Sequence, residues 1–181
     1  MFFVSDALLD QILADDIPYG DATTALLGIE KVPGIVRCRP KAETTIAGVT
    51  LAERLFARVG LQTTRFHEEG DTVAAGTVIL EGRGSAGAIH AVYKTAQNIL
   101  EYASGIATRT HQMVEEARVG NPLCRVAVTR KHFPGTKTLS LYAAITGGAV
   151  VHRMGLSESV LVFDQHRVFI ADFEKRLTEA K

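Results

Sequence analysis

Residues 123–132 read Leu-Cys-Arg-Val-Ala-Val-Thr-Arg-Lys-His, an apolar run that changes abruptly into a polar, cationic one. The apolar half has the length and β-branched content of a buried strand, and the polar half begins where that strand would end. Downstream we expect a helix over 136–146, an extended segment over 149–151, a strand over 159–163 and a helix from residue 172. Strands that alternate with helices are typical of parallel βα units. This part of the chain therefore predicts an α/β barrel or an open sheet.

Upstream of this stretch, the longest pattern is a helix over residues 86–118. Its apolar stripe recurs at alternating steps of three and four and consists of Ile89, Val92, Ala96, Ile99, Ala103 and Ile106. Gly105 falls within the stripe and indicates a close packing contact or a bend. Earlier elements are expected as helices over 5–14 and 50–59 and as strands over 34–39, 44–49, 61–66 and 76–81. This first part is α+β, and the change of rhythm places a domain boundary between residues 107 and 121.

The 181 residues include 20 lysines and arginines and 20 aspartates and glutamates, so attraction to nucleic acid or to an anionic membrane is not expected. The charges are nevertheless unevenly distributed, because residues 117–157 contain basic side chains and no acidic one. The basic residues are Arg118, Arg125, Arg130, Lys131, Lys137 and Arg153. Such a cluster favours a phosphate or carboxylate ligand, with chance as the alternative. Cys38 and Cys124 lack metal or redox spacing, and no apolar run predicts a transmembrane helix, so we expect a reduced, cytoplasmic protein.

Polar side chains follow three of the predicted strands in succession. They are Arg130, Lys131 and His132 after the first strand, His152 and Arg153 after the second, and Asp164 and His166 after the third. Parallel α/β folds bind ligands at the carboxyl ends of their strands, so we expect an anion site there, with solvated turns as the alternative. The histidines show no metal-ligand spacing, so a metal ion held by the protein is not expected.

A glycine-rich motif precedes the long helix. Residues 82–87 match G-x-G-x-x-G, the fingerprint of dinucleotide-binding folds. The acidic residue at the required distance, Glu101, lies inside the helix pattern and does not follow a second strand. We therefore favour a flexible glycine-rich turn, and an NAD-binding oxidoreductase remains the alternative.

Six stretches of the sequence together carry a resemblance to a known family. They are Thr129–Gly135, Gly147-Gly148, His152–Glu158, Val160–His166, Asp16-x-x-x-Gly20-Asp21-x-Thr23-Thr24, and Asn98 with Ser104–Thr108. Over nearly its whole length the chain resembles the quinolinate phosphoribosyltransferase (nicotinate-nucleotide pyrophosphorylase) family. It is most similar to the ModD-type branch, pyrophosphorylases associated with molybdenum transport loci.

The resemblance implies an N-terminal open α/β sandwich domain over residues 1–106 and the start of an incomplete C-terminal α/β barrel over 107–181. It implies a glycosyltransferase that moves phosphoribosyl from phosphoribosyl pyrophosphate (PRPP) to the ring nitrogen of an acidic heteroaromatic substrate. Pyrophosphate leaves, and Mg²⁺ is bound together with PRPP. The family also implies a homodimer in which the N-terminal domain of one subunit covers the barrel of the other.

The same resemblance implies roles for individual residues. Lys131 would face PRPP as the catalytic residue, and the acid-substrate pocket would be lined by Arg130, His152 and Arg153. Lys94 stands where the family has an arginine that reaches into the partner's site. The substrate-binding set is completed by His132 and Asp164.

Three positions depart from the quinolinate enzymes. Phe163 stands where they have lysine, His132 where they have threonine, and Lys94 where they have arginine. The loss of the lysine at position 163 and the arginine-to-lysine change at position 94 would weaken recognition of a dicarboxylate, so we expect a substrate other than quinolinate. About 75 residues follow position 106, whereas a closed barrel needs roughly 200 or more. An incomplete barrel is therefore expected, with a truncated, non-catalytic anion-binding or interaction module as the alternative.

Overall fold

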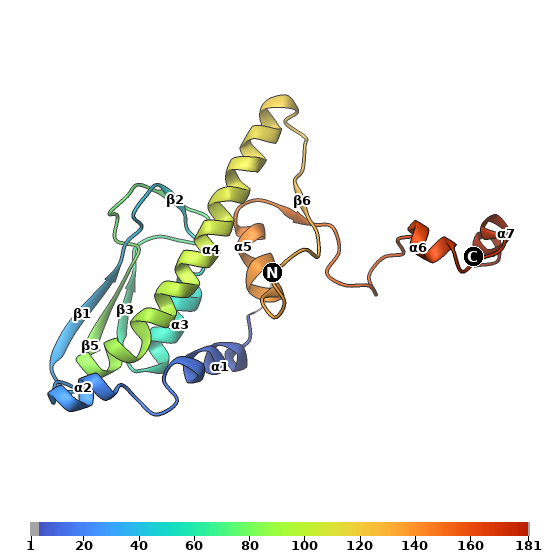
Figure 1. The fold of residues 1–181 in the computed structure, drawn as a ribbon. Coiled ribbons are helices and arrows are strands. Elements are labelled where there is room, and N and C mark those ends of the chain that lie inside the picture. Colours follow the sequence, from blue (N-terminus) through green and yellow to red (C-terminus); the bar gives the residue numbers. More distant parts are fainter. Residues whose placement is uncertain (1–3, 181) are drawn as a thin grey trace.

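The computed structural model describes residues 4–180, which form two parts joined by one long helix (Figure 1). The helices are α1 (Asp6–Asp16), α2 (Ala22–Leu27), α3 (Val49–Arg58), α4 (Ala86–Gly120), α5 (Lys137–Thr146), α6 (Asp164–Arg167) and α7 (Phe173–Glu179). The strands are β1 (Pro33–Cys38), β2 (Thr44–Thr45), β3 (Gln62–Arg65), β4 (Thr72–Val73), β5 (Leu80–Ser85), β6 (Ala127–Val128) and β7 (Val150–Val151). This mixture confirms the α/β class that the sequence predicts.

The N-terminal part is built around a three-stranded antiparallel sheet in the order β1-β5-β3. Its core contains apolar side chains from α3, β5 and α4, among them Phe56, Leu80 and Val92, none of which is exposed to solvent. Burial of this apolar surface is the main stabilising contribution to the N-terminal part.

The first four residues of the glycine-rich motif lie inside the sheet and the last two begin α4, so the expected turn before the long helix is wrong. Gly82 and Gly84 belong to the central strand β5, and the strand predicted over 76–81 begins only at Leu80. A Cβ atom added at Gly82 would lie 2.8 Å from the Phe56 ring, and one at Gly84 would lie 2.5 Å from Leu61 Cδ2. The glycines therefore make room for core side chains, and this antiparallel strand provides no phosphate-binding loop.

The long predicted helix is confirmed as α4. Ser85 caps its start by accepting a hydrogen bond from the Ala88 N–H, and it ends before Asn121. Of the predicted stripe, Val92, Ala96, Ile99 and Ala103 are buried. This stripe packs toward the sheet, α3 and α5, so the same helix supports both parts of the molecule.

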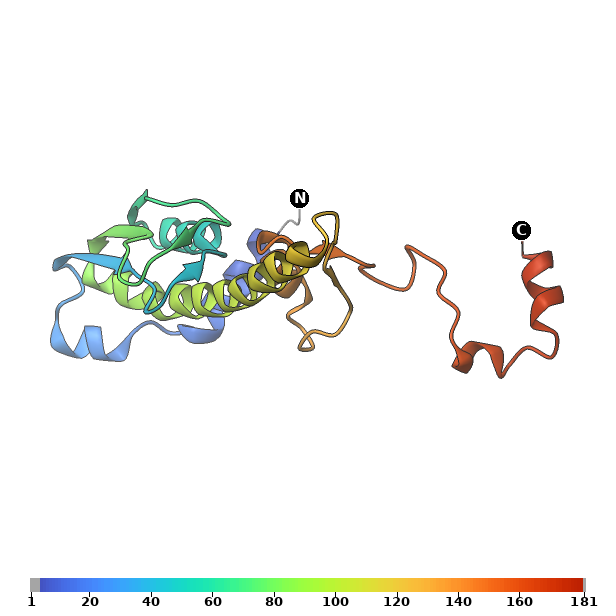
Figure 2. The same ribbon diagram turned by 90° about the horizontal axis from the view of Figure 1, so that it is seen from above.

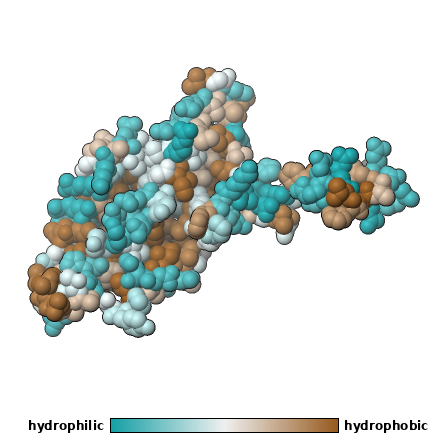
Figure 3. Space-filling view, viewed as in Figure 1, coloured by the Kyte–Doolittle hydropathy of each residue, from teal (hydrophilic) through white to brown (hydrophobic). Residues whose placement is uncertain are grey.

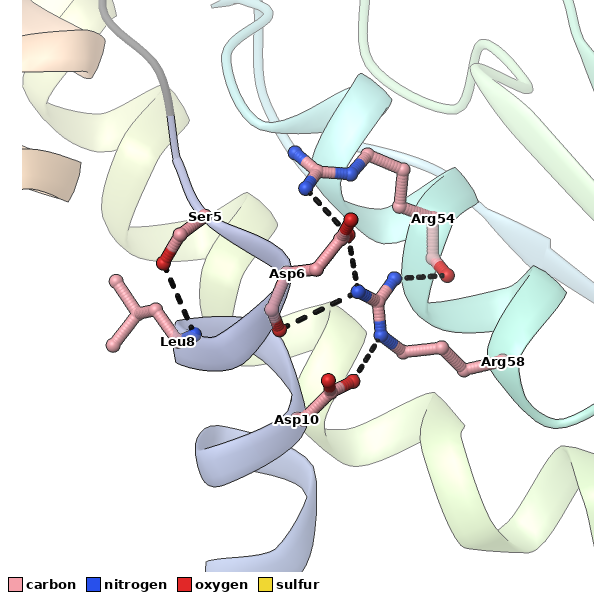
Figure 4. Close-up of polar contacts among 6 residues, drawn as sticks. All are labelled: Ser5, Asp6, Leu8, Asp10, Arg54 and Arg58. Carbon is pink, nitrogen blue, oxygen red and sulfur yellow. Dashed lines mark hydrogen bonds and ion pairs between the residues drawn. The ribbon is translucent and has the colours of Figure 1, made fainter.

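Ion pairs fasten α1 to α3 (Figure 4). Arg58 binds the carboxylates of Asp6 and Asp10, and Arg54 donates to Asp6 at 2.7 Å. Hydrogen bonds from these guanidinium groups lower the pKa of Asp6 and raise that of Arg58. Ser5 caps the same helix through the Leu8 N–H, as its position before the apolar pattern indicates.

The C-terminal part contains one parallel unit, β6-α5-β7, followed by an extended tail. The strand predicted over 159–163 is wrong, because these residues form neither helix nor strand. A strand needs a hydrogen-bonded neighbour, and none of the described residues pairs with this segment. Figures 1 and 2 show the tail, with α6 and α7, lying away from the rest of the molecule.

Apolar side chains remain exposed at both ends of the molecule. Figure 3 shows brown, apolar residues at the lower left, where Figure 1 places α2, and again on the tail. Leu26 on α2 is 86% exposed, and Phe169 after α6 is 88% exposed. Within residues 4–180, no helix combines the length and apolar character that a membrane span requires.

Candidate functional site

The polar residues that follow β6 and β7 lie at one edge of the parallel pair. Val128 pairs with Val151, and the His152 N–H continues the ladder by donating to the Val128 carbonyl at 3.1 Å. Because both strands run in the same direction, Arg130 and Lys131 leave the sheet at the edge where His152 and Arg153 also leave it. Two of the three predicted strand ends are therefore neighbours.

The loop after β6 has a defined conformation. Its Thr136 hydroxyl donates to the Phe133 carbonyl at 2.8 Å, and the His132 N–H donates to the Arg130 carbonyl at 3.2 Å. Gly135 has a φ of 84°, a left-handed conformation that other residues adopt at a cost, so this turn requires glycine. The loop thereby holds four polar residues, Thr129 to His132, above the strand end.

A cavity of about 890 Å³ opens beside this loop. Lys131 and His132 form part of one wall, and α5 contributes Ser140 and several apolar side chains. The opposite walls come from α4 and from the end of α1, where Asp15 and Asp16 are located. The cavity thus combines an apolar interior with cationic and anionic groups, a composition suited to a polar organic ligand.

Arg130, His152 and Arg153 do not line this cavity, although Arg130 stands in the chain between Thr129 and Lys131, which do. The side chains of Arg130 and His152 are exposed, and that of Arg153 is partly buried. All three follow the strand ends, where the two arginines add positive charge beside Lys131.

Lys94 and Asp164 are not brought to this site. Lys94 lies on the exposed side of α4 and donates to Gln97 Oε1 at 3.3 Å. Asp164 is the first residue of α6 in the tail, and its fully exposed carboxylate lies 3.9 Å from Arg167 Nη1. The third strand end is absent because the strand before Asp164 does not form.

Sequence reasoning missed the acidic and hydroxyl groups of the cavity. Asp16 accepts a hydrogen bond of 3.0 Å from Thr95 Oγ1 on α4, which fixes the end of α1 against the long helix. The Thr136 and Ser140 hydroxyl oxygens lie 3.1 Å apart at the start of α5. Asp16 is the first residue of the motif that continues to Thr24, and this position was the feature of the sequence that could have identified it as a site residue.

The rest of that motif stabilises local structure. Asp21 caps α2, and the buried Thr24 hydroxyl donates to Asp21 Oδ2 at 2.6 Å, which lowers the pKa of that carboxyl. Thr24 Oγ1 also lies 2.7 Å from His90 Nδ1 on α4. Since the hydroxyl proton is donated to Asp21, His90 must donate from Nδ1, and α2 is thereby tied to α4.

In the part of the chain that the structure describes, no group of three or more His, Cys, Asp or Glu side chains could hold a metal ion.

Two family models match the chain, one on each side of residue 105. Residues 21–104 match the N-terminal domain of quinolinate phosphoribosyl transferase, and residues 106–181 match its C-terminal domain.

Among curated proteins, the ModD protein of Pasteurella multocida, named as a pyrophosphorylase, is 38% identical over 96% of this chain and 62% of its own length. The ModD protein of Rhodobacter capsulatus is 41% identical over 93% of this chain and 65% of its own length. Among solved structures, NadC from Streptococcus pyogenes superimposes with a TM-score of 0.88 at 27% identity, covering 97% of this chain and 62% of NadC.

The chain therefore spans slightly more than three fifths of the length of these relatives. Both of its parts match domains of the same enzyme group in the same order, and a solved NadC structure shares the arrangement of its elements. The chain belongs to the quinolinate phosphoribosyltransferase family.

Proposed function

We propose that this chain carries the PRPP-binding strand ends of a phosphoribosyltransferase. The reaction joins the phosphoribosyl group to the ring nitrogen of an acidic heteroaromatic substrate and releases pyrophosphate. The single observation that carries the proposal is the parallel pairing of β6 and β7, which presents Arg130, Lys131, His152 and Arg153 at one edge. Family membership supports the same reaction class.

The chemistry needs charge placement more than a protein nucleophile. Displacement at the ribose carbon passes through an oxocarbenium-like state, so oriented cations that bind the leaving pyrophosphate and the acid substrate lower the barrier. We assign Lys131 to the phosphates of PRPP, because it lines the cavity, and Arg130, His152 and Arg153 to the carboxylate of the acceptor. Mg²⁺ would be held on the pyrophosphate oxygens and would neutralise their charge.

We infer that the acceptor is not quinolinate and that the chain is of the ModD type. Phe163 contributes a ring, stacked 6.0 Å from that of His166, where the quinolinate enzymes have a lysine. Lys94 offers a point charge in place of the bidentate fork of arginine. An acceptor with fewer carboxylates suits this set of residues better.

We also propose a cytoplasmic homodimer. Lys94 is exposed on α4 and lies outside the cavity of its own chain, so it is free to reach the site of a second subunit. Cys38 and Cys124 are not joined in a disulfide, which is compatible with a reducing compartment.

The first experiment is a thermal-shift titration of this chain with PRPP and Mg²⁺. We expect a dose-dependent rise in Tm that Lys131→Ala and Arg153→Ala remove, because a ligand that binds the native state stabilises it. Arg118→Ala is the matched control, since it removes an exposed cation from the far end of α4. Absence of a shift from the folded protein would contradict PRPP binding.

The acceptor is tested separately, by release of pyrophosphate from PRPP with quinolinate and with monocarboxylate heteroaromatics. We expect no turnover with quinolinate at ordinary enzymatic rates. Binding of PRPP without turnover on any acceptor would favour a non-catalytic anion-binding module.

A further inference from the structure

Helix α5 contacts both the cavity that contains Lys131 and the core of the N-terminal part. Ser140 and Ala144 line the cavity, whereas the partly buried Tyr142 packs against the N-terminal core. A short helix moves nearly as a rigid body, so contacts made by Tyr142 influence where the cavity wall lies. The residue roles proposed above do not use Tyr142.

Glu69, in the loop between β3 and β4, is a fixed point beside α5. Its carboxylate accepts hydrogen bonds from the Gly48 and Thr50 N–H groups, each at 2.8 Å. These groups lie at the start of α3, where Gly48 has no side chain to cap the helix and a negative charge is favourable. The loop itself is held because the Gly70 N–H donates to the Ile46 carbonyl at 2.8 Å. Glu69 therefore caps α3 and is anchored to the N-terminal part.

The Tyr142 hydroxyl meets this carboxylate. Burial and a hydrogen bond to Glu69 both raise the pKa of Tyr142, because both favour the neutral phenol. The next residue of the loop also lies against α5, since a Cβ on Gly70 would be 3.6 Å from the Thr146 carbonyl oxygen. Thr146 is one turn beyond Tyr142, and its hydroxyl donates to the Tyr142 carbonyl at 3.0 Å. The loop that carries Glu69 thus contacts two successive turns of α5.

The other end of α5 continues from the loop that follows β6. This loop, residues 129–136, ends six residues before Tyr142, or roughly 9 Å along the helix axis. The Thr136 hydroxyl donates to the Phe133 carbonyl and lies 3.1 Å from Ser140 Oγ, so it joins the loop to the first turn of α5. A displacement of α5 would therefore displace the loop that carries Lys131.

We propose that Glu69 and Tyr142 are positioning residues of the phosphoribosyltransferase site. Their contact fixes α5 against the N-terminal part, and α5 in turn fixes the loop that presents Lys131 to PRPP. This inference rests on the proposed function for its ligand, whereas the placement of the loop is measurable without PRPP.

The first test is Tyr142→Phe, which removes the hydroxyl and keeps the ring. In the ¹⁵N-labelled chain this variant should shift the backbone amides of residues 129–136. Tyr19→Phe is the matched control, because it removes the hydroxyl of a fully exposed tyrosine and should leave these amides unchanged. Shifts confined to residues 66–71 and 137–146 would show that Tyr142 serves local packing alone and would overturn the proposal. The Tm of each variant verifies folding.

The second test asks whether the hydroxyl acts through Glu69. Glu69→Gln replaces a charged acceptor with a weaker, neutral one and should shift the same loop amides. In a chain that already carries Glu69→Gln, Tyr142→Phe should cause a smaller further shift, because the two residues act as a pair. Equal shifts in the two backgrounds would overturn the proposed pair.

The functional readout is the Kd for PRPP in the presence of Mg²⁺. Tyr142→Phe should raise this Kd about fivefold, as expected for the loss of one net hydrogen bond, and Tyr19→Phe should leave it within about twofold. A lower Tm with an unchanged Kd would mean that Tyr142 has a structural role only and would contradict the proposal. If the wild-type chain bound no PRPP, the proposed function would fail, and the loop amides would still decide whether Glu69 and Tyr142 position the loop.

Discussion

The two parts of this chain contain similar apolar runs but bury them to very different extents. In the N-terminal part, α3 buries five residues of its ten, and all three strands of the main sheet find neighbours. In the C-terminal part, β6 and β7 pair over two residues each, and α6 and α7 bury none. An antiparallel sheet covered by helices can bury its apolar side chains with segments that are close in the chain. A parallel sheet is stable only when other elements cover both of its faces and further strands pair with its edges.

The largest expected contrast is between two phenylalanines. Phe56→Ala empties a fully buried position in the N-terminal core and should lower the free energy of unfolding by about 3–5 kcal/mol. Phe169→Ala removes an exposed ring from the tail and should change it by less than about 0.5 kcal/mol. Urea unfolding followed by circular dichroism measures both. A cost above 1 kcal/mol for Phe169→Ala would show that the tail packs in solution.

The joint between the two parts is tested by Gly147→Ala. Gly147 ends α5 against α4, and a Cβ there would lie 2.8 Å from Thr110 Cβ and closer still to the Ala107 carbonyl oxygen. Overpacking of this contact should lower the free energy of unfolding by about 1–3 kcal/mol. The control is Gly155→Ala, whose Cβ would meet only Glu158, at 4.0 Å, and which should be nearly neutral by urea unfolding. Equal changes in the free energy of unfolding for the two variants would mean that α5 does not pack against α4.

A smaller effect concerns Glu81 in the central strand. Hydrogen bonds from Arg37, and then from Arg83, hold the pKa of this carboxyl below its usual value, although desolvation opposes them. As pH falls, the Glu81 carboxylate is protonated at a higher pH in the unfolded chain than in the folded one. The stabilisation is therefore present above pH 4.5 and is lost as pH falls toward the folded-state pKa. Tm measured from pH 6 to pH 3 should therefore fall less steeply in Glu81→Gln than in the wild type.

Glu115→Gln, on the exposed end of α4, serves as the control for this pH dependence. Parallel Tm curves for the wild type and Glu81→Gln would contradict a stabilising role for the two arginines.

The smallest expected effect is at the attachment of α1 (Figure 4). Asp10→Asn weakens an exposed ion pair to Arg58, so Tm should fall by no more than about 2 °C at low salt and by less at high salt. A larger fall that persists at high salt would show that α1 is anchored mainly through this pair.

The sequence predicted elements best where the pattern was long. The stripe of α4 is periodic over many turns, so its buried face followed from spacing alone. The glycines of β5 were misread, because a glycine that makes room for a side chain from elsewhere looks the same in sequence as one in a turn. Of the predicted site residues, Lys131 and His132 share a cavity, but Asp164 lies away from them.

Local chemistry was sufficient for helices α1, α3, α4, α5 and α7, the cap at Ser5, the cationic character of the strand ends and the family resemblance, but not for α2 and α6. These depend on residue type and short spacing, which can be read directly from the chain. Other features depended on which distant segments of the chain meet. They are the failure of residues 159–163 to form a strand, the packing of Phe56 and Leu61 against Gly82 and Gly84, and the hydrogen bond between Asp16 and Thr95. A strand forms only beside a hydrogen-bonding neighbour, and a cavity exists only between packed elements, so neither is encoded in a local pattern.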